Sequence, residues 1–146
     1  MVRLNDISLT TLCLLINVIL GNATFVRMTN LIYKQEVYDI IGACMDVHNE
    51  LGHGFLEVVY GDALMIEFEK RGIPFNREQK FEIGYKGQIL AHKYYADFVV
   101  FDKIILELKA ASYIVDEHIA QTLNYVKASN LQLGLIVNFG REKMEY

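Results

Sequence analysis

Apolar positions in the first half of the organised chain recur at helical spacing. They fall three and four residues apart over residues 33–51 and again over residues 55–71, which is the pattern of amphipathic helices with one buried stripe. Gly52 and Gly72 follow the two segments, and glycine readily adopts the left-handed conformation that ends a helix. Pro74 prevents continuation of the second segment. The sequence therefore predicts two consecutive helices.

The spacing changes to alternation after the proline, as is typical of strands. The predicted elements are strands at 79–86, 88–101 and 103–110, a helix at 114–128 and a strand at 131–139. Lys86-Gly87 indicates a hairpin turn between the first two strands. The last segment is apolar almost throughout, as expected of a strand that pairs in parallel beneath helices. We predict an α/β fold in which a three-stranded antiparallel meander and one parallel strand form a mixed sheet flanked by helices.

The N-terminal region contains an apolar run at residues 8–20. It is shorter than the ~20 residues that a membrane span requires. Three interpretations remain: a secretory signal, a hydrophobic anchor or additional helix, and an upstream extension with Met28 as the working start. We favour the extension because the organised pattern begins at Tyr33. Residues 1–27 are then an extension, and residues 28–146 form one domain without a membrane element.

Charge and cysteine content limit the function classes. The net charge of −4 is unfavourable for binding nucleic acid through many phosphate contacts, so such a role requires a local basic surface or bound cations. Cys13 and Cys44 are the two cysteines, too few for a disulfide framework or a cysteine metal site. Cys44 lies in a helical stripe and is expected in the core. We expect a cytoplasmic protein.

Charged residues interrupt two otherwise apolar strands. Alternation places Asp97 on one face with Tyr95 and Val99, and it places Glu107 and Lys109 together on the next strand. The two carboxylates face the same way only if the connecting loop has an odd length. We predict a three-residue loop at 101–103, which sets Asp97 opposite Glu107.

This pattern has two interpretations. Adjacent carboxylates repel, and a hard cation such as Mg²⁺ relieves that repulsion because it prefers oxygen ligands. Lys109 would then orient a water molecule and stabilise charge developing on a phosphate. The alternative is ordinary alternation of charge on an exposed strand face, with a cross-strand salt bridge between a glutamate and a lysine.

Two helices offer further polar groups. His118, Gln121 and Tyr125 follow each other at three and four residues, so they form one polar stripe directly after the charged strands. Glu57 lies in the first turn of the second helix, where the helix dipole favours a carboxylate even without a functional role.

These residues, taken together, resemble a known superfamily. Ala96-Asp97, Glu107-Leu108-Lys109 and Gln121…Tyr125 resemble the PD-(D/E)xK nucleases, in the branch with a RecB-type QxxxY motif. Gly54…Glu57…Tyr60 resembles the signature of the GxxExxY protein family, as does Asn138-Phe139-Gly140. The likeness covers residues 31–141. It implies a restriction-endonuclease-like core.

The resemblance also implies roles for individual residues. Asp97, Glu107 and Glu57 would hold Mg²⁺, with Mn²⁺ as a substitute, and Lys109 would be the catalytic lysine. The catalytic set would further include Glu57, Gln121 and Tyr125, the last two lining the site. Ala96 replaces the proline of the superfamily's name, a position that does no chemistry. His53 stands where a proline is expected, which concerns the turn and not the metal.

Three hypotheses about function follow. The first is Mg²⁺-dependent hydrolysis of phosphodiester bonds in nucleic acid, with DNA as the expected substrate. The second is a catalytically silent nuclease-fold module that binds nucleic acid or a protein partner. The third is a structural unit in which Glu107 and Lys109 form a salt bridge. A small nuclease domain of this kind would act as a homodimer or beside a partner.

Overall fold

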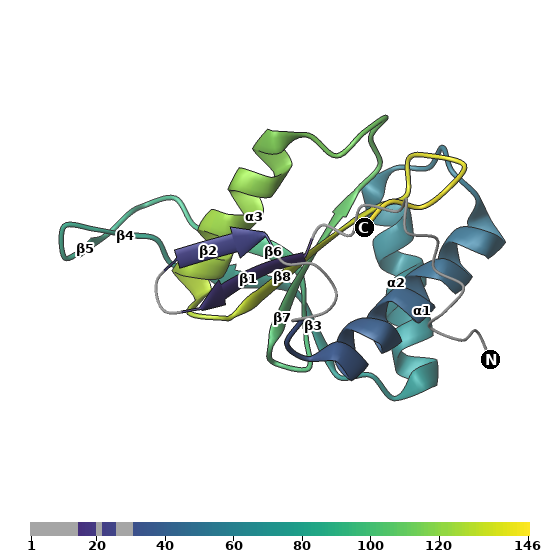
Figure 1. Ribbon diagram of the computed structural model, residues 1–146, viewed down its shortest axis with the longest axis horizontal. Helices are drawn as coiled ribbons and strands as arrows, with labels where there is room; N and C mark the ends of the chain where they lie inside the picture. Colours follow the sequence, from purple (N-terminus) through teal and green to yellow (C-terminus); the bar gives the residue numbers. More distant parts are fainter. Residues whose placement is uncertain (1–14, 20–21, 26–30) are drawn as a thin grey trace.

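The computed structural model describes residues 15–19, 22–25 and 31–146 (Figure 1). Its centre is a mixed six-stranded sheet in the order β2-β1-β8-β7-β6-β3. The elements are, in chain order, β1 (Leu15–Ile19), β2 (Asn22–Phe25), α1 (Lys34–Leu51), α2 (Glu57–Arg71), β3 (Phe75–Phe81), β4 (Gly84–Tyr85), β5 (Gln88–Ile89), β6 (Tyr94–Val100), β7 (Ile104–Lys109), α3 (Asp116–Ser129) and β8 (Leu133–Asn138). Strands β7 and β8 run parallel, and the other neighbours are antiparallel.

Helices cover the sheet on both faces (Figure 1). Helices α1 and α2 bury their apolar stripes on one face, where Phe68 packs edge-on against Phe98 of β6. Helix α3 covers the other face, where its Val126 packs with Val99 and Ile105. Because β8 lies between the layers, all six of its residues are buried. This burial on two faces explains the unbroken apolar sequence of the strand.

The predicted α/β architecture is confirmed. The two N-terminal helices end at Gly52 and Gly72, both with positive φ as expected of helix-ending glycines. The meander β3–β6–β7 and the parallel strand β8 make up the predicted mixed sheet. Cys44 is a free, fully buried thiol of α1.

The first two strand predictions were wrong in their extent. Strand β3 begins at Phe75, directly after the proline, and ends at Phe81. The Lys86-Gly87 turn does form, but it joins two strands of two residues each, and these make a separate sheet. The sequence could not show that residues 82–93 leave the main sheet, because polar and apolar residues are mixed there as they are in the strands on either side.

The predicted loop at 101–103 is confirmed. Strand β6 ends at Val100 and β7 begins at Ile104, and these two residues are paired. Phe101 and Asp102 both have positive φ, which allows the chain to reverse over three residues. The same register, continued past the last pair Phe98–Leu106, brings position 97 opposite position 107.

The N-terminal region adds two strands to the edge of the sheet. Strand β1 pairs antiparallel with β8, and β2 pairs with β1, so residues 15–19 are a strand and not a helix. The rest of the apolar run, and Met28, lie outside the described residues. Among the helices within residues 31–146, none combines the length and apolarity that crossing a membrane needs.

Candidate active site

The site forms where β6 and β7 separate. Their pairing ends at Phe98 and Leu106, whereas β7 continues beside β8 as far as Lys109. Beyond the last pair, the backbone amide of Leu108 donates to Oδ2 of Asp97 at 2.8 Å. A carboxylate from β6 therefore occupies the gap that opens between the two strands.

Glu57 reaches the same strand from the start of α2. Its Oε1 accepts a hydrogen bond from the amide of Ala110 at 3.1 Å. Leu108 lies on β7 and Ala110 directly follows the strand, so their amides lie about 6.6 Å apart along the extended chain. Asp97 and Glu57 are thus held side by side, by the amides that precede and follow Lys109 in sequence.

A break in the alternation of β6 sets the position of Asp97. Ala96 packs toward α3, but Phe98 packs toward α2, so the alternation of side chains shifts between them. No residue is inserted, because Gln79–Ala96 and Arg77–Phe98 belong to one register. The ladder skips the pair Glu78 and Asp97, where Glu78 has a φ of 52°. The break in alternation therefore lies at Asp97, whose carboxylate occupies the gap.

One predicted neighbour of Asp97 is corrected by this break. Val99 does not share its face, because Val99 packs toward α3, whereas Asp97 lines the pocket beside α2. Tyr94 is buried, and its hydroxyl donates a hydrogen bond to Oε1 of Glu107. Tyr94 is therefore a site residue that regular alternation could not find.

Glu107 lies on the α3 side of the site beneath two aromatic rings. Its carboxyl group is almost completely buried, and the ring of Tyr94 is stacked on the ring of Tyr125 from α3. Gln121, one turn earlier on α3, hydrogen-bonds to Tyr125. The sequence-predicted pair Gln121 and Tyr125 thus lies over Glu107, with Tyr94 between Tyr125 and the carboxylate.

Burial and neighbouring negative charge disfavour the charged forms of the Asp97 and Glu107 carboxyl groups. Burial, followed by the charge of Asp97, raises the pKa of Glu107 to about 7. Burial is also the main cause of a raised pKa at Asp97, where the amide of Leu108 and the charge of Lys109 act in the opposite direction. Burial and the neighbouring Glu107 raise the pKa of Tyr94 as well. The site therefore holds two carboxyl groups whose ionisation a cation would assist.

The connection before α2 explains how Glu57 is presented. Tyr60 is fully buried, its hydroxyl donates to the carbonyl of Gly52 at 2.9 Å, and it accepts from the amide of Phe55 at 3.3 Å. The Tyr60 ring also stacks on Phe139 with centroids 4.5 Å apart. The tyrosine thus fixes the turn that precedes α2, and Glu57 follows it in the first helical turn.

The end of β8 fastens the segment that follows Lys109. Asn138 is fully buried, and its side-chain amide accepts from the Ala111 amide at 3.0 Å and donates to the Ala111 carbonyl at 2.9 Å. A Cβ on Gly140 would lie 2.3 Å from the Ala111 carbonyl oxygen. The Asn138-Phe139-Gly140 sequence is therefore explained by close packing against the chain beside the site.

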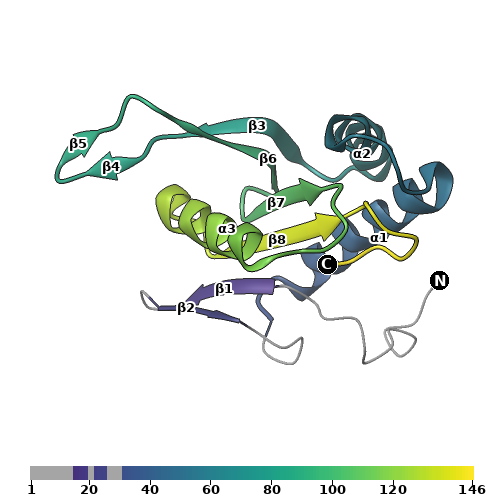
Figure 2. The same cartoon turned by 90° about the horizontal axis from the view of Figure 1, so that it is seen from above.

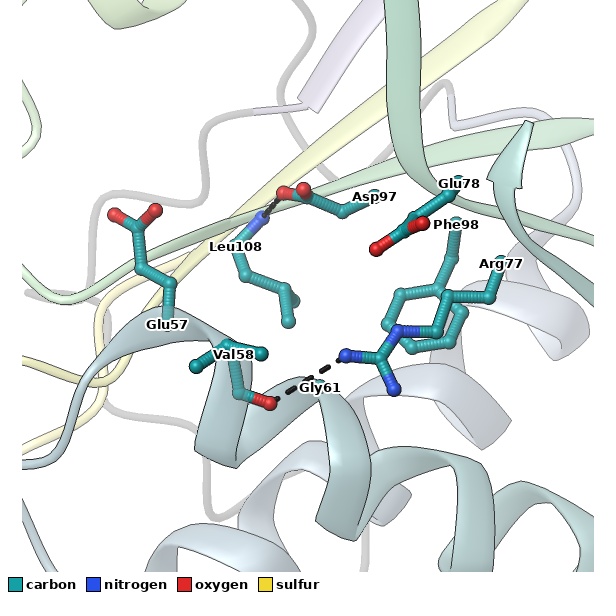
Figure 3. Close-up of a pocket in the computed structure, with 8 residues that line it drawn as sticks. All are labelled: Glu57, Val58, Gly61, Arg77, Glu78, Asp97, Phe98 and Leu108. Atoms are coloured by element: carbon teal, nitrogen blue, oxygen red, sulfur yellow. Dashed lines mark hydrogen bonds between the residues drawn. The ribbon is translucent and has the colours of Figure 1, made fainter. Parts of the chain in front are cut away.

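A pocket of about 220 Å³ opens between α2 and strands β3 and β6 (Figure 3). It is lined by Glu57, Val58, Gly61, Arg77, Glu78, Asp97, Phe98 and Leu108. Figure 3 shows the Glu57 and Asp97 carboxylates on one part of the rim, with the Arg77 guanidinium on another part. Carboxylates from three elements and one guanidinium thus share this hollow.

Arg77 is a second residue that the sequence analysis missed. Its guanidinium forms an ion pair with Asp62 of α2 and lies 5.9 Å from the centre of the Phe98 ring. Gly61 leaves room for it, since a Cβ there would lie 3.0 Å from a guanidinium nitrogen. A glycine inside a helix costs about 1 kcal/mol relative to alanine. Gly61, one turn after Glu57, was therefore a readable signal of a close approach.

His118 has a different place from the one expected of the polar stripe. Its Nδ1 lies 3.4 Å from the amide of Val115, where it caps the N-terminus of α3. Its backbone carbonyl also accepts from the hydroxyl of Thr122 at 3.0 Å. These contacts explain His118 as a residue that begins the helix.

The carboxylate oxygens that could bind a divalent cation come from three elements, α2, β6 and β7. Within residues 31–146, no three His, Cys, Asp or Glu side chains are close enough together to form a ready-made metal site. The spacing of the Leu108 and Ala110 amides accounts for the separation of Asp97 from Glu57. Asp97 and Glu107 nevertheless suit a hard cation, because both are oxygen donors and the charge of Asp97 disfavours the charged form of Glu107.

Comparison with known proteins agrees with this geometry. A model of the PD-(D/E)XK nuclease superfamily matches residues 34–146, and the chain belongs to that superfamily. The fold is of the metal-dependent nuclease type, and proteins of the superfamily generally use divalent metals. No curated protein and no solved structure matches the chain.

Proposed function

We propose that the protein is a divalent-metal-dependent nuclease that hydrolyses phosphodiester bonds, with DNA as the expected substrate. The observation that supports this proposal is the gap between β6 and β7. Buried carboxyl groups on both strands, Asp97 and Glu107, meet there beside Lys109, and the pKa of each is raised in part by burial. Such an arrangement is costly to stability unless it binds a cation.

The roles of the residues follow from their chemistry. Asp97 and Glu107 would hold Mg²⁺ or Mn²⁺, and Glu57 would contribute from α2 across the pocket. The bound ion would supply Lewis-acid polarisation of the phosphoryl group. Lys109 would orient the attacking water by hydrogen bonding and stabilise negative charge on the phosphoryl oxygens. Gln121 and Tyr125 would keep Glu107 in place through Tyr94.

Cleavage assays with a charge-removing variant test the proposal. Labelled single- and double-stranded DNA and RNA are incubated with wild-type protein in Mg²⁺, Mn²⁺ or EDTA. We expect cleavage that requires metal, and a cleavage rate in Glu107→Gln that is at least about a hundredfold lower than in the wild type. Glu50→Gln, at an exposed position of α1, is the matched control and should cleave like the wild type.

The opposite result would favour the silent nuclease-fold module. Binding of nucleic acid or of a protein partner, without cleavage in either metal, would show that the fold is used for recognition alone. Cleavage that is equal in wild type and Glu107→Gln would contradict the assigned metal ligands.

A further inference from the structure

Strands β3 and β6 lead into a projecting hairpin, which we call the arm and define as residues 82–93. Strands β4 and β5 form a small sheet of their own near its tip. Both views show the arm extending away from the body of the molecule (Figures 1 and 2). Lys86 and Gly87 both have positive φ, so the tip is a tight two-residue hairpin turn.

The arm displays aromatic and apolar side chains together with positive charge. Tyr85 and Ile89 are 59% and 61% exposed. The ammonium of Lys86 lies 5.4 Å from the centre of the Tyr85 ring. Residues 82–93 contain two lysines, one histidine and one acidic residue, Glu82, in a chain whose net charge is −4. Glu82 pairs with Lys93 at 3.3 Å, whereas Lys86 lies at the tip. The arm thus carries a formal charge of 2 − 1 = +1, opposite in sign to the charge of the whole chain.

A second exposed pair connects the arm with the pocket. Tyr95 and Lys80 are cross-strand neighbours on β6 and β3, and both are exposed. Tyr94 and Ala96 pack toward α3, so Tyr95 points to the opposite face, the one on which α2 lies. The pocket with Arg77 is on this same face.

We propose that the arm and the Lys80–Tyr95 pair bind single-stranded nucleic acid and direct it toward the pocket. This inference deepens the proposed function and rests on it. Tyrosine rings can stack on bases that are free of a duplex, while neighbouring lysines attract the phosphates. Nucleic acid therefore matches both properties of this surface. Tyr85 is at most about 29 Å along the chain from Arg77, a length that a few extended nucleotides span.

Binding of a labelled oligothymidylate of about twelve nucleotides, a length suited to such surfaces, tests the inference. The full chain carries Lys109→Ala so that the probe stays intact. We expect Tyr85→Ala with Tyr95→Ala to lower affinity at least tenfold, since each stacked base is worth about 1–3 kcal/mol. Lys80→Gln with Lys86→Gln should reduce the slope of log affinity against log salt by about 1.4.

A matched control variant separates the arm from the rest of the surface. Ile66 and Lys70 of α2 are an exposed apolar and basic pair outside the arm, and Ile66→Ala with Lys70→Gln should bind like the parent protein. A duplex of the same length should bind more weakly, with no effect of the tyrosine substitutions. Unchanged binding of the single strand by the tyrosine variant, or a preference for the duplex, would overturn the inference.

Two further measurements keep this inference distinct from the proposed function. Bis(p-nitrophenyl) phosphate is too small to reach from the pocket to the arm, so arm variants with Lys109 intact should hydrolyse it like the wild type. If the wild type cleaves no substrate while binding still depends on the arm, the proposed nuclease fails and the arm inference stands. If arm substitutions instead convert a dimer to a monomer in sedimentation without weakening binding, the arm serves self-association and the inference fails.

Discussion

Burial and a neighbouring charge both act on the carboxyl group of Glu107. It lies beneath Tyr94, its hydrogen-bond donor, and close enough to Asp97 for repulsion to raise its pKa. In the absence of metal the group is therefore half-protonated near pH 7, well above the range of an ordinary glutamate. A cation at the site would remove this difference by favouring the carboxylate.

The raised pKa of Glu107 predicts a specific dependence of stability on pH. Between its ordinary value of 4.5 and about 7, the folded protein retains a proton that the unfolded chain releases, so rising pH lowers the free energy of unfolding. The loss is at most about 3 kcal/mol. Glu107→Gln should lack this component. Urea unfolding in EDTA at pH 5 and pH 8 measures it, with Glu50→Gln as the control, and equal pH dependence in all three proteins would contradict it.

Under the proposed function, Arg77 would bind substrate and would not hold metal. Its guanidinium lines the pocket beside Asp97 and contacts α2 through Asp62. Arg77→Ala should lower the affinity for nucleic acid roughly tenfold to a hundredfold, as expected for loss of a charged hydrogen bond, and leave the affinity for Mg²⁺ unchanged. Arg77→Lys should recover part of the loss because it keeps the charge without the planar fork.

A second arginine provides the control for this prediction. Arg71 also pairs with carboxylates, Glu67 and Asp46, but on the side of α2 that meets α1. Arg71→Ala should leave nucleic-acid affinity unchanged in protein that remains folded. Equal losses in the two alanine variants would show that Arg77 does not contact the substrate. A fall in kcat with KM unchanged in Arg77→Ala would contradict a role in substrate binding and indicate a contact made only in the transition state.

At the scale of elements, the alternation of side chains between the two faces of a strand gave correct predictions where the strands are regular. The requirement that Asp97 and Glu107 face the same way predicted the three-residue loop, and the loop has that length. Alternation failed one residue away, because the side chains of β6 change faces at Asp97 without a change of register. Tyr94 was therefore missed, since nothing in an alternating sequence indicates where the side chains change faces.

The contact between the end of β8 and the chain after β7 predicts a stability effect. Gly140→Ala places a Cβ against the backbone of Ala111, which cannot move without breaking the hydrogen bonds to Asn138. We expect a loss of about 1–3 kcal/mol in the free energy of unfolding. Gly84→Ala is the matched control, because it has open space and no positive φ. A Gly140→Ala protein as stable as Gly84→Ala would show that this contact is looser than described.

At the scale of the whole molecule, composition described the average charge but not its distribution. The net charge of −4 argued against extensive phosphate contacts, whereas the fold gathers a basic, aromatic segment on one projecting arm. The four strands and three helices of the core followed from periodicity. The turn of the arm was predicted from local pattern, but its separation from the main sheet was not. The pairing of β1 with β8 depends on how distant segments meet and could not be predicted from local pattern.

The central claim is that Asp97, Glu107 and Lys109 form a metal-dependent hydrolytic site, and single-turnover cleavage by lysine variants tests it most directly. The cleavage rate of Lys109→Ala in Mg²⁺ is compared with that of Lys127→Ala, in which an exposed lysine of α3 is replaced. Calorimetry measures the binding of Mg²⁺ to each variant. We predict that Lys109→Ala binds the ion but cleaves at least about a hundredfold more slowly, while Lys127→Ala matches the wild type. Equal cleavage by the two variants, or no metal-dependent cleavage by the wild type, would contradict the account.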